Sequence, residues 1–156
     1  MQKCLLAVLL CTLALSLPSL AQKPRKVSPG PAPDKALMQK IWDGWSTLNP
    51  DHTAQFYAKG QHTFFDAAPL KYDNWDEYAI GVKKEFGDYK AAKFEVNDDA
   101  QIHPAGEYAW GTATIKFDMT TGSGKRELGT FRWTVVWQKQ EGKWLIVHEH
   151  VSAPME

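Results

Sequence analysis

The end of the chain constrains the fold most, because residues 130–154 read as one long hairpin. Two runs rich in β-branched and aromatic residues flank the turn residues 140–143. This pattern predicts two antiparallel strands joined by a tight turn. Since side chains alternate between the two faces of a strand, the apolar residues of the first run should share one face. They are Phe131, Trp133, Val135 and Trp137.

The second strand of this hairpin places an acid among apolar residues. By alternation one face holds Leu145, Val147, Glu149 and Val151, and the other holds Ile146, His148 and His150. Burial would raise the pKa of Glu149 unless Lys116 or Arg132 compensates. Three roles therefore stay open for Glu149: a general acid or base, a contact with a ligand, or a structural ion pair with one of these two cations.

The first 33 residues are not expected to belong to the folded domain. Lys3 precedes an apolar run over residues 5–17, and small residues at 19–21 follow, which predicts a secretory signal peptide over residues 1–21 rather than an uncleaved anchor. Residues 22–33 are rich in proline and indicate a disordered tether. We therefore expect an exported protein, periplasmic or secreted.

Composition excludes several classes of function. Both cysteines, Cys4 and Cys11, lie within the predicted signal peptide, so disulfides and thiolate catalysis are excluded for the remaining chain. The 18 basic and 18 acidic residues of the whole sequence balance. This balance points to no nucleic acid and, after signal cleavage, to no membrane as a partner. Nucleophile motifs, phosphate loops and dinucleotide fingerprints are absent, and we expect no cofactor.

One domain is predicted over residues 34–154. Helices are expected from Asp34 to Leu48, over residues 50–57, and from residues 73–74 to Gly87, with a short strand over residues 62–66 between the last two. Four longer strands follow: one over residues 90–104 with a bend at 98–99, one over residues 107–117, and the two strands of the final hairpin, which we count from residue 130. Helices first and strands last predict an α+β fold, with three N-terminal helices packed on a curved antiparallel sheet.

Several segments together resemble a known family. They are the run Phe64-Phe65-Asp66, the helix start Trp75-Asp-Glu-Tyr78 and the ending Gly142-Lys-Trp-Leu-Ile-Val-His-Glu-His-Val-Ser-Ala-Pro154. These resemble the SnoaL-like branch of the nuclear transport factor 2-like superfamily. The ending is also similar to the association domain of calcium/calmodulin-dependent kinase.

The resemblance implies a cone-shaped half-barrel, usually dimeric through its sheet, with helices closing its mouth. It also implies that Glu149 points inward. The association domain carries arginines on its pocket face, where this chain has Val135 and Val151, with Lys116 at a third position. The same acidic ligand is therefore not expected. Since this fold hosts isomerases, dehydratases, cyclases and oligomerisation hubs, the resemblance does not fix a function.

The strand 107–117 supplies a candidate binding face. Tyr108, Trp110, Thr112, Thr114 and Lys116 share one face, and the small residues Ala109, Gly111 and Ala113 share the other. Aromatic rings, hydroxyls and an amine suit the wall of a pocket. The alternative is a face turned to solvent or to a second subunit.

Three further sites carry alternatives. His103 is either an acid–base partner of Glu149 or a hydrogen-bonded core histidine. Asp66 follows a short strand and either transfers protons or caps a turn. His148 and His150 have a spacing that can chelate a metal, but no third ligand is evident, so we expect surface histidines and no metal.

The sequence thus predicts a secreted small-molecule pocket protein. It would be a cofactor-free isomerase, dehydratase or cyclase acting by proton transfer on a small apolar or aromatic molecule, and it is expected to form a homodimer. The predicted catalytic residues are Glu149, His103 and Asp66, and the predicted ligand contacts are Tyr57, Trp110, Thr112, Thr114, Lys116 and Trp133. The alternative is a non-catalytic dimerisation or ligand-sensing module.

Overall fold

The computed structural model describes residues 31–67 and 69–154. The predicted signal peptide and most of the predicted tether lie outside the described residues. The helical elements are α1 (Lys35–Trp45), η1 (Pro50–His52), η2 (Ala54–Phe56) and α2 (Trp75–Phe86). The strands are β1 (Gln61–Phe65), β2 (Tyr72–Asn74), β3 (Tyr89–Val96), β4 (Gln101–Ala105), β5 (Tyr108–Thr121), β6 (Arg126–Gln140) and β7 (Lys143–Ser152).

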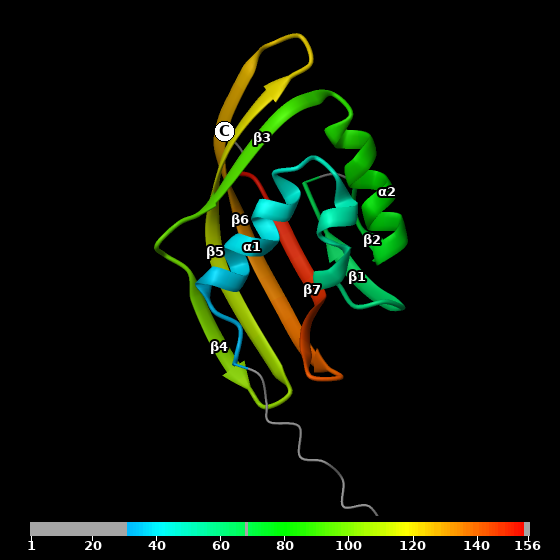
Figure 1. Cartoon of the computed structure of the whole chain (residues 1–156), viewed down its shortest axis with the longest axis vertical. Helices are drawn as coiled ribbons and strands as arrows, with labels where there is room; N and C mark the ends of the chain where they lie inside the picture. Colours follow the sequence, from blue (N-terminus) through cyan, green and yellow to red (C-terminus); the bar gives the residue numbers. More distant parts are fainter. Residues whose placement is uncertain (1–30, 68, 155–156) are drawn as a thin grey trace, which may run out of the picture.

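The strands form one curved, unclosed sheet in the order β2-β1-β7-β6-β5-β3, and β4 also pairs with β5. Every pairing is antiparallel except that of β1 with β7, which is parallel. In Figure 1, α1 crosses the hollow face of the sheet and α2 lies beside β1 and β2. The predicted α+β half-barrel is confirmed, with the short second helix present as two 3-10 turns, η1 and η2.

Local capping explains where the two long helices begin. The Asp34 carboxylate accepts a hydrogen bond from the backbone N–H of Leu37 at 2.8 Å. Asn74 caps α2 in the same way, accepting from the N–H of Glu77 at 2.9 Å. Glu77 returns the contact by accepting from the Asn74 amide at 2.9 Å. Such reciprocal capping satisfies N–H groups that have no partner within a helix. It fixes the start of α2, which carries part of the candidate site.

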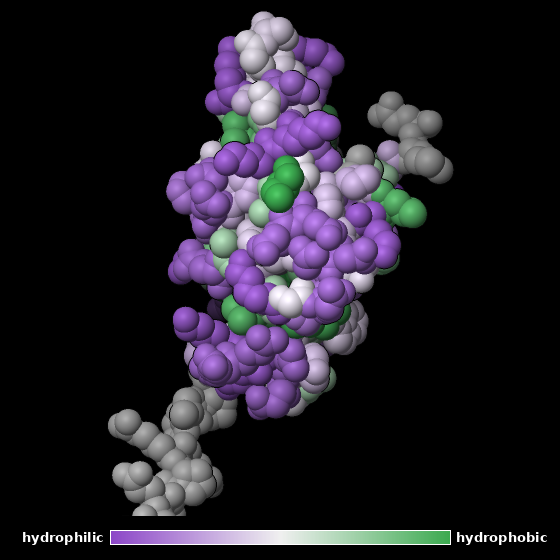
Figure 2. All heavy atoms as spheres, turned by 90° about the vertical axis from the view of Figure 1, so that its right-hand side faces the viewer, coloured by the Kyte–Doolittle hydropathy of each residue, from purple (hydrophilic) through white to green (hydrophobic). Residues whose placement is uncertain are grey.

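The core lies between α1 and the hollow face of the sheet. Trp42 of α1 meets Trp133 of β6 edge to face, with ring centroids 5.5 Å apart. Trp133, Val135 and Trp137 are buried, which confirms the predicted inward face of β6. On the side that carries α2 the surface is largely hydrophilic, with separated hydrophobic residues (Figure 2). Within the described residues no helix is long and apolar enough to cross a membrane.

The face predicted for β5 is wrong. The buried residues of β5 are Ala109, Gly111, Ala113, Ile115 and Met119, whereas Trp110 is 45% exposed on the outer side of the sheet. The reason is the close approach of α1: a methyl group added to Gly111 would lie 2.8 Å from the end of the Met38 side chain. Small residues therefore mark the strand face on which the helix rests, and the larger, more polar residues face outward.

Alternation along β7 is also interrupted. The register shifts between the pair Val136–His148 and the pair Trp137–Ile146, so one residue of β7 is unpaired there. Ile146 is fully buried, although simple alternation placed it on the outer face with His148. A bulge of this kind changes which residues point inward on its two sides. Glu149 and Val151 lie beyond the bulge and do point inward, as predicted.

Candidate functional site

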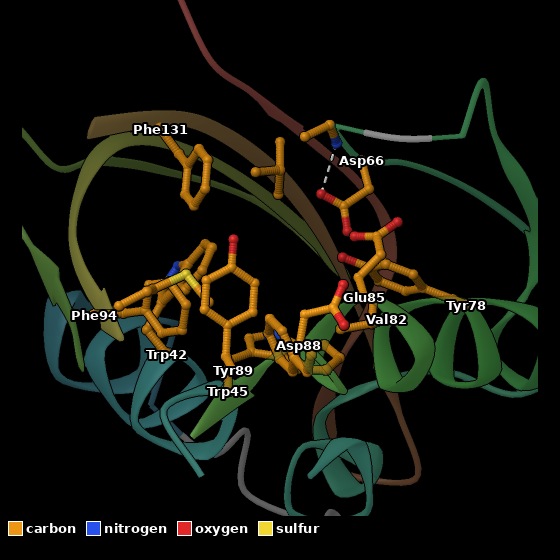
Figure 3. A pocket seen from close by; sticks show the side chains of 14 residues that line it. Trp42, Trp45, Asp66, Tyr78, Val82, Glu85, Asp88, Tyr89, Phe94 and Phe131 are labelled. Carbon is orange, nitrogen blue, oxygen red and sulfur yellow. Dashed lines mark hydrogen bonds between the residues drawn. The ribbon is translucent and has the colours of Figure 1, made fainter. Parts of the chain in front are cut away.

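A cavity of about 360 Å³ opens between α2, the start of β3 and the hollow face of the sheet. Half of its 14 lining residues are aromatic. Figure 3 shows Trp42, Phe94 and Phe131 on one side of this cavity, and Asp66, Tyr78 and Glu85 on the other. The cavity therefore has an aromatic side and an acidic side. This is the arrangement of most small-molecule sites, where apolar walls surround a few placed polar groups.

Asp66 comes directly after β1 and is half-buried at the cavity wall. Its carboxylate accepts a hydrogen bond from the backbone N–H of Ala67 at 2.7 Å, so the predicted turn cap is present. Loss of water contact raises the pKa of Asp66, against the opposing effects of Ala67 and of a hydrogen bond from Tyr78. Asp66 thus both caps its turn and presents a carboxyl to the cavity.

Glu85 lies on α2 one turn after Val82 and two turns after Tyr78, and all three line the cavity. Desolvation and repulsion from Asp66 raise its pKa to about 7, although a hydrogen bond from Tyr72 acts in the opposite direction. Neither Asp66 nor Glu85 takes part in an ion pair with a described residue. Two carboxyls without a cation therefore stand at one side of the cavity.

Glu149 lies in the core and does not line the cavity. Its carboxyl accepts hydrogen bonds from the Tyr57 hydroxyl at 2.8 Å and from the Trp133 indole N–H at 2.9 Å. Trp45 in turn donates to the Tyr57 hydroxyl at 3.1 Å. Burial raises the pKa of Glu149 to about 7, and the hydrogen bonds from Tyr78, Trp133 and Tyr57 limit the increase.

Tyr78 connects the buried carboxyl with the cavity. Its ring lines the cavity, and its hydroxyl lowers the pKa values of both Asp66 and Glu149. Glu149 is thereby placed to act on the cavity through Tyr78 rather than to touch a ligand.

The predicted ion pair of Glu149 does not form. Lys116 and Arg132 are both exposed on the outer side of the sheet. Arg132 instead donates to the backbone carbonyl of Ala153 at 2.7 Å. The carboxyl of Glu149 is balanced by neutral donors alone among the described residues.

Of the predicted catalytic residues, the structure places Asp66 at the cavity wall, Glu149 behind it in the core, and His103 away from both. His103 lies on the outer face of β4, stacked on Trp110 with ring centroids 4.0 Å apart. His103 and Trp110 are paired across β4 and β5, so both side chains lie on the same, outer face of the sheet. The expectation that His103 helps Glu149 is therefore wrong.

The predicted ligand contacts fall into two groups, neither of which lines the cavity. Tyr57 and Trp133 lie beneath it and hold Glu149. The other four belong to the outer face of β5: Trp110, Thr112, Thr114 and Lys116. Thr114 there donates to the Asp99 carboxylate at 2.8 Å. The prediction that this face forms the pocket wall is wrong, because α1 packs on the opposite face of β5, which carries the small residues.

Sequence reasoning missed Glu85 as a site residue. A signal was present, since Tyr78, Val82 and Glu85 recur at helical spacing and therefore share one face of α2. Glu85 shares a helix face with apolar residues, just as Glu149 shares a strand face with apolar residues, so the same reasoning applied to it. Tyr89 and Asp88, which follow α2, also line the cavity and were not predicted to do so.

The two histidines of β7 lie outside the cavity. The Nδ1 atom of His148 is 2.7 Å from the backbone oxygen of Thr63, and both His148 and His150 contact the Phe65 ring edge to face. Within the described residues no group of three His, Cys, Asp or Glu side chains is placed to hold a metal ion.

Comparison with known families matches residues 35–156 to the SnoaL-like domain. This chain belongs to the SnoaL-like domain family. The match covers the helices, the sheet and every residue of the cavity. A comparison with curated proteins finds no match.

Solved structures share the fold of this SnoaL-like chain at low sequence identity. A nuclear transport factor 2-like superfamily protein from Salmonella enterica is 19% identical, with a TM-score of 0.68, covering 78% of this chain and 92% of its own. A candidate calcium/calmodulin-dependent protein kinase II association domain from Xanthomonas campestris is 23% identical, with a TM-score of 0.68 and coverage of 78% and 86%. A candidate scytalone dehydratase from Novosphingobium aromaticivorans is 10% identical, with a TM-score of 0.68 and coverage of 78% and 81%.

Proposed function

We propose that this SnoaL-like protein is exported and binds a small molecule with an aromatic or apolar body, on which it carries out proton transfer without a cofactor. The cavity carries this proposal, because aromatic walls face the paired carboxyls of Asp66 and Glu85. Export is supported by the basic, apolar and small-residue order of residues 1–21. The fold shared with a candidate dehydratase agrees with this class of reaction.

The two cavity carboxyls supply an acid and a base at the same pH. With a pKa of about 7, Glu85 is part protonated near neutrality, and its charge is coupled to that of Asp66. One carboxylate removes a proton from a carbon atom of the substrate, and the protonated partner returns a proton elsewhere. Return to another carbon gives isomerisation, whereas return to a departing hydroxyl releases water and gives dehydration. Both reactions balance without an oxidant or a reductant.

The first experiment combines a ligand screen with proton exchange. A library of small apolar and aromatic molecules is tested by thermal shift, and each ligand found is then incubated in D₂O with the protein. Loss of its C–H signals in ¹H NMR measures proton transfer. We expect exchange that decreases at least about 100-fold in Asp66→Asn or Glu85→Gln, in line with the contribution of a positioned acid or base.

Glu95→Gln is the matched control, since Glu95 is an exposed acid on β3 that does not line the cavity. Exchange should be unchanged in this variant. A ligand that binds at the cavity without any exchange would contradict catalysis and favour the alternative, a non-catalytic ligand-sensing module.

A dimerisation role is a second proposal that a different feature favours. Tyr108 and Trp110 are 49% and 45% exposed on the outer face of the sheet, and His103 stacks on Trp110. Such an exposed aromatic group on a broad sheet face is typical of an interface between subunits. We therefore propose a homodimer through this face, which leaves the cavity on the opposite side of the sheet free.

A further inference from the structure

The charged groups that line the cavity all have the same sign. Asp66, Glu85 and Asp88 line it, and no Lys, Arg or His does. The whole chain has equal numbers of acidic and basic residues, so this bias is a property of the cavity and not of the composition. None of the three acids takes part in an ion pair within residues 31–67 and 69–154. A ligand that enters therefore meets negative charge that no protein cation neutralises.

The opposite side of the cavity offers aromatic faces. Trp42, Phe94 and Phe131 lie there, across from the acids (Figure 3). The face of an aromatic ring carries negative electrostatic potential and attracts ammonium groups, most strongly where water is excluded. Carboxyls on one side and rings on the other thus favour the same kind of ligand. An anion would be repelled by both.

A separate observation concerns Trp42. This residue lines the cavity and is only 5% exposed, and its indole Nε1 has no hydrogen-bond partner among the described residues. Buried donors are nearly always paired in folded proteins, and an unpaired one costs free energy. Trp137 has the same unpaired atom but does not line the cavity. The Nε1 atom of Trp42 is itself shielded from solvent, so Trp42 offers its ring and not its N–H to the cavity.

We propose that the cavity binds an organic cation. Its protonated or quaternary amine would lie against Asp66 and Glu85, and its apolar or aromatic body would lie against the rings. This inference rests on the proposed function, since it names the class of molecule that the same cavity takes. Metal ions are a poorer match, because no three described ligating side chains converge.

Repulsion between the acids gives the binding a pH dependence. The charge of Asp66 contributes to the raised pKa of Glu85, and a cation placed between the two would relieve that repulsion. Binding then favours the ionised carboxyls and releases protons, so affinity rises as the pH increases from 6 to 8. Glu149, on β7 behind the cavity, is coupled to Asp66 and titrates over the same range, because its pKa is also raised to about 7. Three tyrosines face these acids from β2, from α2 and from the start of β3: Tyr72, Tyr78 and Tyr89. Each keeps its proton over this range, because its pKa is raised above the ordinary value for tyrosine.

Two probes of nearly equal shape test the charge. They are 3-hydroxyphenyltrimethylammonium and the neutral 3-tert-butylphenol, in which carbon replaces nitrogen. Dissociation constants are measured by calorimetry at pH 7. We expect the first probe to bind at least tenfold more tightly than the second.

Two variants test the assigned groups. In Asp66→Asn/Glu85→Gln the advantage of the cation over its neutral counterpart should decrease below threefold. Neutral side chains replace acids that resist ionisation, so this variant should fold, which a thermal melt checks. Glu95→Gln should retain the full advantage of the cation.

Equal or tighter binding of 3-tert-butylphenol would overturn the cation inference and leave the proposed function standing, because the cavity would still hold a neutral aromatic. Failure of both probes, with other apolar ligands bound in the screen, would also overturn only this inference. Failure of both the probes and the screen would overturn the two proposals together. A preference that persists in the double variant would place the cation elsewhere and contradict the assignment.

Discussion

Glu149 is a buried acid held by neutral donors, and its ionisation should be visible in the stability of the protein. Its pKa in the folded state is raised from 4.5 to about 7. Between these values the folded protein binds more protons than the unfolded chain, so the free energy of unfolding decreases as the pH rises and levels off above about 7. The full decrease due to Glu149 should be on the order of 3 kcal/mol.

Urea unfolding of the wild type and of Glu149→Gln at several pH values measures this effect. The wild type should lose about 2 kcal/mol more than the variant between pH 5 and pH 8, because the amide cannot ionise. Glu85 should contribute nearly equally to both proteins, and any constant cost of the amide cancels in the comparison of slopes. The charge of Asp66 acts on Glu149, so the measured difference includes this coupling. Parallel profiles would show that Glu149 ionises without penalty, contrary to the burial described.

At this scale the sequence predicted the inward direction of Glu149 but not its environment. Alternation along β7 suffices for the direction, because the residue lies beyond the bulge. Its partners Tyr57 and Trp133 lie 92 and 16 positions away, and no local pattern specifies such contacts. Glu85 was accessible from helical spacing, but its raised pKa depends on Asp66, which comes from a different element.

Among the elements, the contact between α1 and β5 depends on the absence of a side chain at Gly111. A methyl group there would lie 2.8 Å from Met38 and 2.9 Å from the backbone oxygen of Gln101. Since the backbone of β4 cannot move aside as a side chain can, Gly111→Ala should lower the free energy of unfolding by about 1–3 kcal/mol. Chemical denaturation measures the change.

Gly122→Ala is the matched control. Its added methyl would lie 3.7 Å from the nearest atom, the backbone oxygen of Asp88, which is an ordinary contact. The stability of this variant should stay within about 0.5 kcal/mol of the wild type. Equal effects of the two substitutions would mean that α1 does not rest on Gly111.

The same contact explains which parts of the fold the sequence could predict. Amino-acid composition and the spacing of apolar residues predicted the order of helices and strands, and the family resemblance predicted the half-barrel. Alternation alone could not decide which face of β5 is covered. A face of small residues and a face of larger, more polar residues could each have been the inner one. Only the position of α1, a contact between distant segments, makes Ala109 and Ala113 the inner residues. The bulge in β7 and the short β2 were missed for a related reason, because both depend on pairing partners.

For the molecule as a whole, the two faces of the sheet have different chemistry. The hollow face is covered by helices and holds the cavity, whereas the outer face exposes Trp110 and its stacked partner His103. Stable interfaces bury on the order of 1,600 Å² in total and are enriched in aromatic residues at their centre. We therefore expect the wild type to be a dimer at micromolar concentration and Trp110→Lys to be a monomer, as measured by multi-angle light scattering.

Leu128→Lys provides the comparison, because Leu128 is also exposed, at 62%, but lies close to the tip of the β5–β6 hairpin rather than beside His103. This variant should remain dimeric. Since Trp110 does not line the cavity, the monomeric variant should bind cavity ligands with unchanged affinity. A wild-type monomer would contradict the proposed interface and leave the cavity proposals intact. Loss of ligand binding on dissociation would instead mean that a second subunit supports the site, which the separation of the two faces argues against.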